Sequence, residues 1–323
     1  MFVVLVGLFV TEIPSPAWAI ANWSIVSSPN AKTGNELQAV SCASTTSCVA
    51  VGEDDKSGVP EEALAESWNG KTWTIRSSPN MQKSDSDLLG VSCASANSCE
   101  AVGWYTNSTG DDRALAESWN GKTWAIRSSP NPETAAAVVL DGVSCVSANS
   151  CEAVGLYISP GNGGLTLTES WNGKTWVIQS SPNPEPAAGD VLNGVSCVSA
   201  TSCEAVGYSI VPDSGNDLIL IESWNGSTWT IQSSPNPETT AREALDAVSC
   251  VSATSCQSVG SYGEVNDQTL TESWNGSTWT IQSSPNNGRS DALSGVSCVS
   301  SSCTAVGYYD NSPQQLTLVE SYH

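Results

Sequence analysis

Short hydrophobic runs separated by turn residues recur along the whole chain. In one representative stretch, Leu140 to Pro184, four such runs follow one another: Leu140–Cys145, Cys151–Tyr157, Leu165–Trp171 and Thr175–Ser180. The runs are short and rich in β-branched, aromatic or aliphatic residues, which is typical of strands. No part of the chain shows the sustained 3.6-residue period of an amphipathic helix. The pattern therefore predicts an all-β protein.

This four-strand unit occurs six times, and a close pair of cysteines marks each copy. The first cysteines of successive pairs lie 51, 52, 52, 53 and 48 residues apart. Bulky side chains such as Leu167 and Trp171 share one face of the expected sheet, and small ones such as Thr168 share the other. Sheets of this kind stack bulky face against small face around an axis, and a regular repeat of about 50 residues is typical of such arrays. We therefore predict a six-bladed β-propeller with four antiparallel strands per blade.

An Asn-Gly dipeptide separates the third and fourth runs in five copies. Asn-Gly is a strong signal for a two-residue type I′ hairpin turn, in which both turn residues have positive φ. A two-residue loop at Asn172-Gly173 would place Trp171 opposite Lys174 and Glu169 opposite Trp176. The dipeptides are Asn69-Gly70, Asn120-Gly121, Asn172-Gly173, Asn225-Gly226 and Asn275-Gly276.

The two ends of the chain complement each other. The last residues, Val319–His323, match the third strand of the unit, whereas Asn22–Asn30 match the fourth strand and the linker after it. We therefore expect the last blade to be closed by the N-terminal strand, in a single domain spanning residues 20–323. Before it, the apolar run Phe2–Val10 is too short to cross a bilayer, and Ala17-Trp18-Ala19 matches a cleavage site. Residues 1–19 are thus interpreted as a signal peptide, with a buried N-terminal strand as the alternative.

The composition of the chain excludes several classes of function and partner. The chain has 33 Asp and Glu against 11 Lys and Arg, a formal net charge of −22, so nucleic acid is excluded as a partner. Its one histidine is the last residue, which excludes His-based catalysis and His-ligated zinc. Twelve cysteines are expected in an oxidising compartment. We therefore expect a secreted or cell-surface monomer that does not insert into the membrane.

The segment Ser67-Trp68-Asn69-Gly70-Lys71-Thr72-Trp73 resembles a shortened Asp-box, the S-x-D-x-G-x-T-W repeat of sialidases and other bacterial-neuraminidase-repeat (BNR) propellers. It is one residue shorter and has Asn in place of Asp. With its cysteine pair and S-S-P-N-P linker, the whole unit is similar to repeats of secreted bacterial BNR-like proteins, over the full mature chain. The resemblance implies a propeller fold and adds a sialidase-like carbohydrate-active enzyme as an alternative function.

Residues present in every copy are interpreted as structural, because a site is needed once. Each cysteine pair offers only two ligands, whereas zinc prefers four, so we predict disulfides and no metal or cofactor. The recurring glutamate, for example Glu169, is expected to make structural hydrogen bonds, and the recurring tryptophans are expected to fill the spaces between blades. The predicted disulfides are Cys42–Cys48, Cys93–Cys99, Cys145–Cys151, Cys197–Cys203, Cys250–Cys256 and Cys298–Cys303.

Ligand binding is expected where the copies differ. Loops between the second and third strands, and between one blade and the next, share one face of the propeller and vary most; we call it the variable face. Acidic clusters there, such as Glu53-Asp54-Asp55, lack known calcium-site spacing and are interpreted as solvated charge, with calcium as the alternative. Aromatic residues and the arginines absent from other copies make up the candidate site: Trp104, Tyr105, Arg113, Tyr157, Tyr208, Arg242, Tyr262, Arg289, Tyr308 and Tyr309.

These features favour a non-catalytic binding or scaffold module that takes a glycan or protein ligand on the variable face. Two alternatives stay open: a sialidase-like enzyme and a purely structural envelope protein. Sialidases hold a substrate carboxylate with three arginines, and Arg113, Arg242 and Arg289 are the arginines that such a site would need here.

Overall fold

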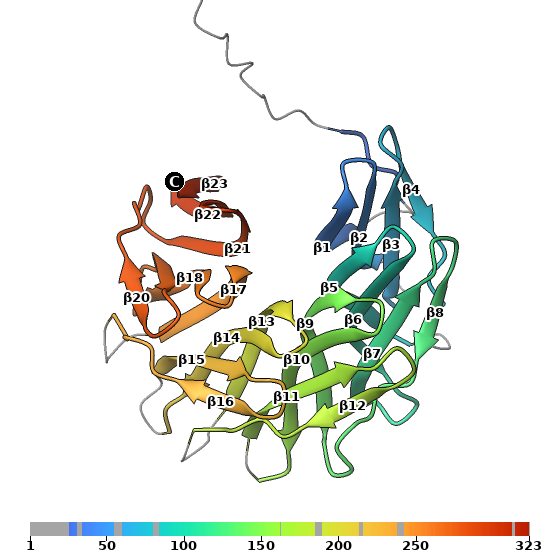
Figure 1. Cartoon of the computed structure of the whole chain (residues 1–323), viewed down its shortest axis with the longest axis horizontal. Helices are drawn as coiled ribbons and strands as arrows, with labels where there is room; N and C mark the ends of the chain where they lie inside the picture. The colour runs from blue at the N-terminus through green and yellow to red at the C-terminus, as the bar shows by residue number, and fades with distance from the viewer. Residues whose placement is uncertain are drawn as a thin grey trace, which may run out of the picture.

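The computed structural model describes residues 26–30, 34–54, 60–79, 84–161, 163–184, 189–212, 216–237, 242–311 and 314–322. Within these ranges the chain forms six antiparallel sheets around one axis (Figure 1). Strands follow chain order from the axis outward, and the first strands of neighbouring sheets lie side by side. The prediction of a six-bladed, all-β propeller is confirmed.

The blades are numbered in chain order, and the last of them has three strands in the described ranges rather than four. Blade 1 contains β1 (Asn35–Ser44), β2 (Ser47–Asp54), β3 (Glu62–Trp68) and β4 (Trp73–Arg76); blade 2 contains β5 (Ser86–Ser95), β6 (Ser98–Thr106), β7 (Asp112–Trp119) and β8 (Trp124–Arg127). Blade 3 contains β9 (Ala137–Ser147), β10 (Ser150–Ser159), β11 (Gly163–Trp171) and β12 (Trp176–Gln179); blade 4 contains β13 (Asp190–Ser199), β14 (Ser202–Ile210), β15 (Asp217–Trp224) and β16 (Trp229–Gln232). Blade 5 contains β17 (Arg242–Ser252), β18 (Ser255–Gly263), β19 (Gln268–Trp274) and β20 (Trp279–Gln282); blade 6 contains β21 (Asp291–Val299), β22 (Ser302–Asn311) and β23 (Gln314–Tyr322).

A β-bulge bends the innermost strand of every blade at the same place. In blade 3, Leu140 pairs with Gly155 and Gly142 pairs with Val154, so Asp141 is the extra residue. A Cβ on Gly155 would lie 2.2 Å from the carbonyl oxygen of Val139, which explains why this position is glycine in all six copies. One residue of each inner strand is thus left out of the regular alternation of side chains between the two faces of the sheet.

The Asn-Gly turns are one residue pair wider than predicted. Trp171 pairs with Trp176, and Glu169 pairs with Ile178, so the predicted register is wrong. The reason is the asparagine side chain: Asn172 Oδ1 accepts hydrogen bonds from the backbone N–H of Lys174 and Thr175 at 3.0 and 3.1 Å. Only Gly173 in this turn has positive φ, 87°, so the turn is not type I′. The two indoles consequently face each other, with ring centroids 5.6 Å apart.

Hydrophobic cores lie between the blades rather than within them. The core between blades 2 and 3 contains Val102 and Ala116 from one side and Leu140, Trp171 and Trp176 from the other. The corresponding clusters recur at the other interfaces from blade 1 to blade 6, although the last one is smaller and holds no tryptophan. This arrangement confirms that the tryptophan pairs of blades 2 to 5 pack between blades.

All six predicted disulfides are present, and each bridges the first two strands of its own blade. No free cysteine occurs among the described residues.

Two sets of hydrogen bonds join neighbouring blades. In the first set, which we call the Ser–Glu latches, a serine donates to a glutamate on the third strand of a blade. In five of the six, the serine follows the fourth strand of the preceding blade, and the glutamates are buried except Glu320, which is half-buried. The latches are Ser28–Glu66, Ser78–Glu117, Ser129–Glu169, Ser181–Glu222, Ser234–Glu272 and Ser284–Glu320.

In the second set, a backbone N–H of one inner strand donates to a serine hydroxyl of the preceding one. The five bonds, at 2.9–3.0 Å, are Cys93–Ser41, Cys145–Ser92, Cys197–Ser144, Cys250–Ser196 and Cys298–Ser249. In the described ranges no equivalent bond joins Cys42 to Ser297. Val40 of blade 1 is 62% exposed and Val306 of blade 6 is 48% exposed, whereas Val91 and Val259 at the same positions are buried. The interface between blades 6 and 1 therefore lacks the packing of the other five, as Figure 1 shows.

The predicted signal peptide and the predicted closing strand both lie outside the described residues, apart from Val26–Asn30. In the described part of the chain, no helix has the length and apolar character needed to cross a membrane.

Candidate functional site

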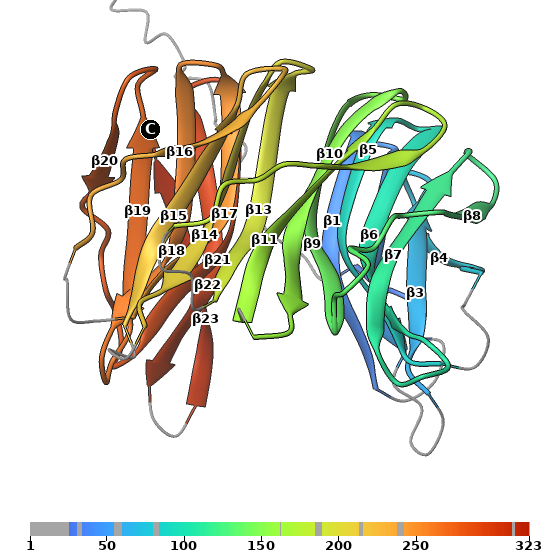
Figure 2. The same cartoon turned by 90° about the horizontal axis from the view of Figure 1, so that it is seen from below.

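The two ends of the propeller carry different chemistry. Seen edge-on in Figure 2, the strands run between two rims. One rim carries the disulfides and the Asn-Gly turns, which are nearly identical from blade to blade. The other rim, the variable face, carries the loops that end at β3, β7, β11, β15 and β19 and those that enter the next blade. All ten predicted ligand-binding residues lie at this second rim or in the strand ends beside it.

Strand alternation separates the predicted aromatic residues into two rows. Tyr105, Tyr157 and Tyr262 point to the side of the preceding blade, where they pack against the hydrophobic clusters. Tyr309 occupies the same position in β22, opposite Asp291. This row is half-buried, and the hydroxyl of Tyr262 donates to Gln268 Oε1 at 2.7 Å. The first row is therefore engaged in the fold.

The second row contains Trp104, Tyr208 and Tyr308, one residue earlier in their strands and hence on the opposite side of the sheet. All three are half-buried. Burial, together with the charges of Asp217, Asp141 and Asp246, raises the pKa of Tyr208. Burial and the charges of Asp267, Asp246 and Asp310 raise the pKa of Tyr308. The second row thus reaches a group of carboxylates contributed by several blades.

The sequence reasoning missed the carboxylates on the inner strands. Asp141, Asn193 and Asp246 are the bulge residues of β9, β13 and β17. Asn193 Nδ2 donates to the carbonyl of Leu245 at 3.0 Å and to Asp246 Oδ1 at 3.4 Å, which links two blades beside the axis. Burial raises the pKa of Asp141 to about 7 and that of Asp246 to about 6. We call Asp141, Asn193, Asp246 and Tyr208 the axial group.

A signal for the axial group was present in the sequence. The bulge position lies inside the otherwise repetitive motif L-x-(G/A)-V-S-C, yet it differs strongly between copies. Its six occupants are Gln38, Leu89, Asp141, Asn193, Asp246 and Ser294. Variation inside a repeated strand, and not only in loops, would have pointed to these residues.

The three arginines are not gathered in one blade. Arg113 is the second residue of β7 in blade 2, Arg242 begins β17 of blade 5, and Arg289 lies in the connection to blade 6. Arg113 is held by its own loop, since Nη2 contacts Asp111 Oδ2 at 3.1 Å and Nη1 donates to the carbonyl of Asp112 at 2.7 Å. Arg242 and Arg289 are exposed.

Carboxylates also cluster at the rim between blades 1 and 2. Burial, followed by the charges of Asp87 and Glu61, raises the pKa of Glu53 to about 7. Among the described residues, however, no group of three or more His, Cys, Asp or Glu is placed to hold a metal ion. Asp55, in one of the acidic clusters weighed as calcium sites, lies outside the described residues.

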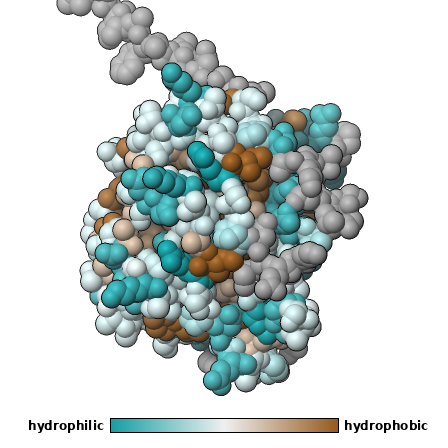
Figure 3. Space-filling model, turned by 90° about the vertical axis from the view of Figure 1, so that its right-hand side faces the viewer, coloured by the Kyte–Doolittle hydropathy of each residue, from teal (hydrophilic) through white to brown (hydrophobic). Residues whose placement is uncertain are grey.

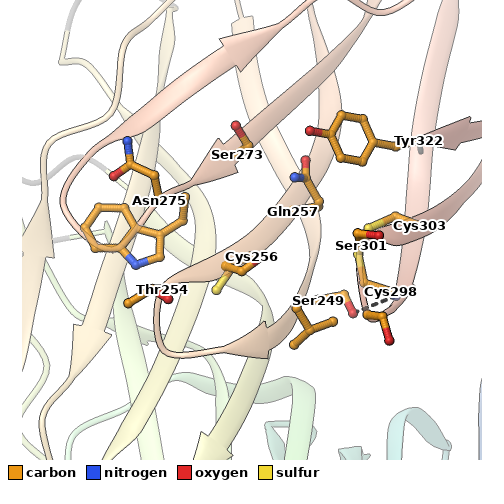
Figure 4. A pocket seen from close by; sticks show the side chains of 14 residues that line it. Ser249, Thr254, Cys256, Gln257, Ser273, Asn275, Cys298, Ser301, Cys303 and Tyr322 are labelled. Atoms are coloured by element: carbon orange, nitrogen blue, oxygen red, sulfur yellow. Dashed lines mark hydrogen bonds between the residues drawn. A yellow bond between two sulfur atoms is a disulfide. The ribbon is translucent and has the colours of Figure 1, made fainter.

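Two cavities lie between blades 5 and 6. One, of about 360 Å³, opens beside the disulfide rim and is lined by Gln257, Trp274, Cys303 and Tyr322 among others (Figure 4). The second, of about 510 Å³, continues outward from Gln257 and Tyr322 to Gln282 and Pro285. None of the ten predicted residues lines either cavity. On the side that Figure 3 presents, the hydrophobic patches are small and separated by hydrophilic residues.

No family model matches the chain, and no curated protein sequence matches it, so the Asp-box resemblance stays a prediction. Solved propeller structures do match. A lectin from the fungus Aleuria aurantia, described as a six-bladed β-propeller with a novel fucose recognition mode, is 13% identical over 86% of this chain and 90% of that one, with a TM-score of 0.53.

A sialidase, Hadza microbial sialidase Hz136, is 10% identical over 88% of this chain and 64% of that one, with a TM-score of 0.57. YCF48 bound to a D1 peptide is 14% identical over 94% of this chain and 86% of that one, with a TM-score of 0.52. At such identities these likenesses show a shared fold and nothing finer.

Proposed function

We propose that the protein is a non-catalytic carbohydrate-binding module that works in an oxidising, extracytoplasmic compartment. The observation that carries the proposal is the axial group, where carboxyl, amide and phenol groups from three blades converge on the side of the variable face. Ligand sites commonly combine aromatic surfaces with a few convergent polar groups. The six disulfides support the compartment, since such bonds persist in oxidising environments.

The chemistry of the axial group favours a neutral or amino sugar. Carboxylate oxygens and the Asn193 carbonyl accept hydrogen bonds from hydroxyl groups, and an aromatic ring offers a face for the apolar side of a sugar ring. An anionic sugar would meet Asp141, Asp246 and the acidic surface of a chain with formal charge −22. Like charge disfavours that encounter. The same reasoning weakens the sialidase-like alternative, because its substrates carry a carboxylate.

A glycan array containing neutral, amino and sialylated sugars tests the proposal, followed by calorimetric titration of the best ligand. We expect Tyr208→Ala and Asp246→Asn to weaken binding at least about tenfold, which corresponds to 1.4 kcal/mol. Trp104→Ala, in the same row, is expected to cost about 1–3 kcal/mol if the indole contacts the ligand.

Tyr157→Phe is the matched control, because this tyrosine lies at the same rim but packs toward the preceding blade. It should bind as the parent does. Unchanged affinity in Tyr208→Ala, Asp246→Asn and Trp104→Ala would refute the proposed site. Turnover of a sialoside that is lost in Arg113→Ala, Arg242→Ala or Arg289→Ala would establish the enzyme instead.

A further inference from the structure

Among the described residues, no strand pairs with the outer edge of β23 in blade 6. In blades 1 to 5, the last four residues of the third strand pair with the fourth strand, as Thr168–Trp171 pair with β12. The equivalent residues of β23, Val319–Tyr322, pair only with β22 among the described residues. Val319 is 56% exposed, although Ala116 and Ile221 at the same position are buried. An exposed edge of this kind accepts another strand.

The cavity of about 510 Å³ lies where the fourth strand of blade 6 would place its tryptophan. Its walls include Gln282, Ser283 and Pro285 of blade 5 and Tyr322 of blade 6. Between blades 3 and 4, the matching residues Gln179, Ser180 and Pro182 line a smaller cavity, of about 300 Å³, together with Trp224 and Trp229. Tyr322 corresponds to Trp224, because Tyr322 pairs with Cys303 in blade 6 as Trp224 pairs with Cys203 in blade 4. Figure 4 shows Tyr322 on the same side as Gln257 and Cys303, and among the described residues none corresponds to Trp229 in blade 6.

The described chain begins next to this interface, on the side of blade 1. Ser28 donates to Glu66 and so forms the first of the six Ser–Glu latches. In the other five latches the serine follows a fourth strand by two residues, as Ser181 follows Gln179. The sequence Trp23-Ser24-Ile25 precedes Ser28 at the spacing at which Trp176-Val177-Ile178 precedes Ser181.

We propose that Asn22–Ile25 docks on β23 as the fourth strand of blade 6, with the Trp23 indole in the cavity between blades 5 and 6. By the register of blade 3, Trp23 pairs with Tyr322 and Ile25 with Glu320. The Trp23 ring nitrogen donates to Gln282, as Trp229 Nε1 donates to Gln179 Oε1 at 2.7 Å in the blade 3–4 interface.

Docking of this segment also closes the ring. Ser28 lies five positions after Trp23, and an extended chain of that length spans at most about 18 Å. With Trp23 fixed in blade 6 and Ser28 fixed to Glu66 of blade 1, the two blades are drawn to the spacing of the other five interfaces. The exposed Val40 and Val306 then face each other in a sixth core. This inference is independent of the proposed ligand.

Hydrogen-exchange mass spectrometry on the full chain tests the docking directly. We expect the amides of Ser24 and Ile25 to be protected to the same degree as those of Val177 and Ile178, independent of protein concentration. Trp23→Ala should abolish this protection and lower the thermal midpoint by as many degrees as the matched control Trp176→Ala. Because a chain that begins at Ser27 retains the empty edge, a synthetic peptide of residues 20–30 should bind it one to one.

Other outcomes overturn the proposal. If residues 22–25 exchange freely and Trp23→Ala melts like the parent, the segment does not dock. If protection appears only in a dimer at high concentration, detected by sedimentation, the edge of blade 6 is covered by a second copy and not by its own N-terminal strand. Should the shortened chain fail to fold, the exchange comparison and Trp23→Ala decide the question alone.

Discussion

Lowering the pH is expected to stabilise this protein, against the usual behaviour of carboxyl-rich domains. The glutamates of the latches are buried without a cation beside them, and burial is the main influence on their ionisation. It raises the pKa of Glu169 and Glu222 from 4.5 to about 8, and that of Glu117 and Glu272 to about 7, although the latch serines act in the opposite direction. Folding therefore favours the protonated carboxyl groups.

The sign follows from proton binding in the two states. Between pH 4.5 and 8 the folded chain holds a proton on Glu169 that the unfolded chain has released, so the free energy of unfolding falls as the pH rises. Each such group contributes about 1.4 kcal/mol per pH unit across this window. The free energy of unfolding of a typical domain is only about 5–15 kcal/mol, so several buried glutamates together make stability depend strongly on pH. The stability gained from protonating a buried glutamate is fully present below pH 4.5 and is lost as the pH rises through the pKa of that group in the folded chain.

Urea denaturation followed by tryptophan fluorescence, with the disulfides intact, measures this dependence at pH 5, 6, 7 and 8. Glu169→Gln keeps an acceptor for Ser129 but cannot ionise, so its slope should be shallower than the parent's by up to about 1.4 kcal/mol per pH unit. Glu133→Gln, at an exposed loop position, is the control and should leave the slope unchanged. A free energy of unfolding that stays constant or rises from pH 5 to 7 would refute the reasoning.

Two shorter predictions concern the contacts that repeat around the ring. Ser181→Ala removes the hydroxyl that donates to both carboxylate oxygens of Glu222 and should cost about 1–3 kcal/mol in urea denaturation; the exposed neighbour Ser180→Ala should cost nothing, and equal losses would argue against the latch. The denatured, unreduced protein should contain no titratable thiol, because all twelve cysteines are bridged, and any stoichiometric thiol would contradict the pairing.

The architecture could be predicted because each of its determinants is local and repeated. The cysteine pairs fix the first hairpin, the turn residues separate the strands, and six copies of about 50 residues leave few alternatives to a propeller. The register at Asn172-Gly173 was wrong for a reason that dipeptide statistics do not contain. The asparagine side chain accepts hydrogen bonds from two backbone amides beyond the glycine and so widens the loop from two residues to four.

The candidate site could be predicted only as a face of the molecule. Tyr157 and Tyr208 are similar rim residues in the sequence, yet a difference of one position puts the first in a core cluster and the second beside Asp141 and Asp246. Asp141 was missed because a β-bulge, which the sequence pattern does not announce, places it outside the regular alternation of its strand. Proximity between residues of different blades depends on how the blades pack around the axis, which no single repeat encodes.

The scarcity of cations explains why the blades are joined by serine and glutamate. With 11 Lys and Arg for 33 Asp and Glu, most buried carboxyl groups have no guanidinium or ammonium partner to offset their desolvation. A serine hydroxyl can donate to the carboxyl in either protonation state, and a retained proton removes the charge that burial disfavours. Because the same pair joins each blade to the next from blade 1 to blade 6, protonation acts on all five of these interfaces at once. The pH dependence of stability is therefore a property of the repeat itself, whereas ligand recognition belongs to positions such as Asp141 and Tyr208 at which the repeats differ.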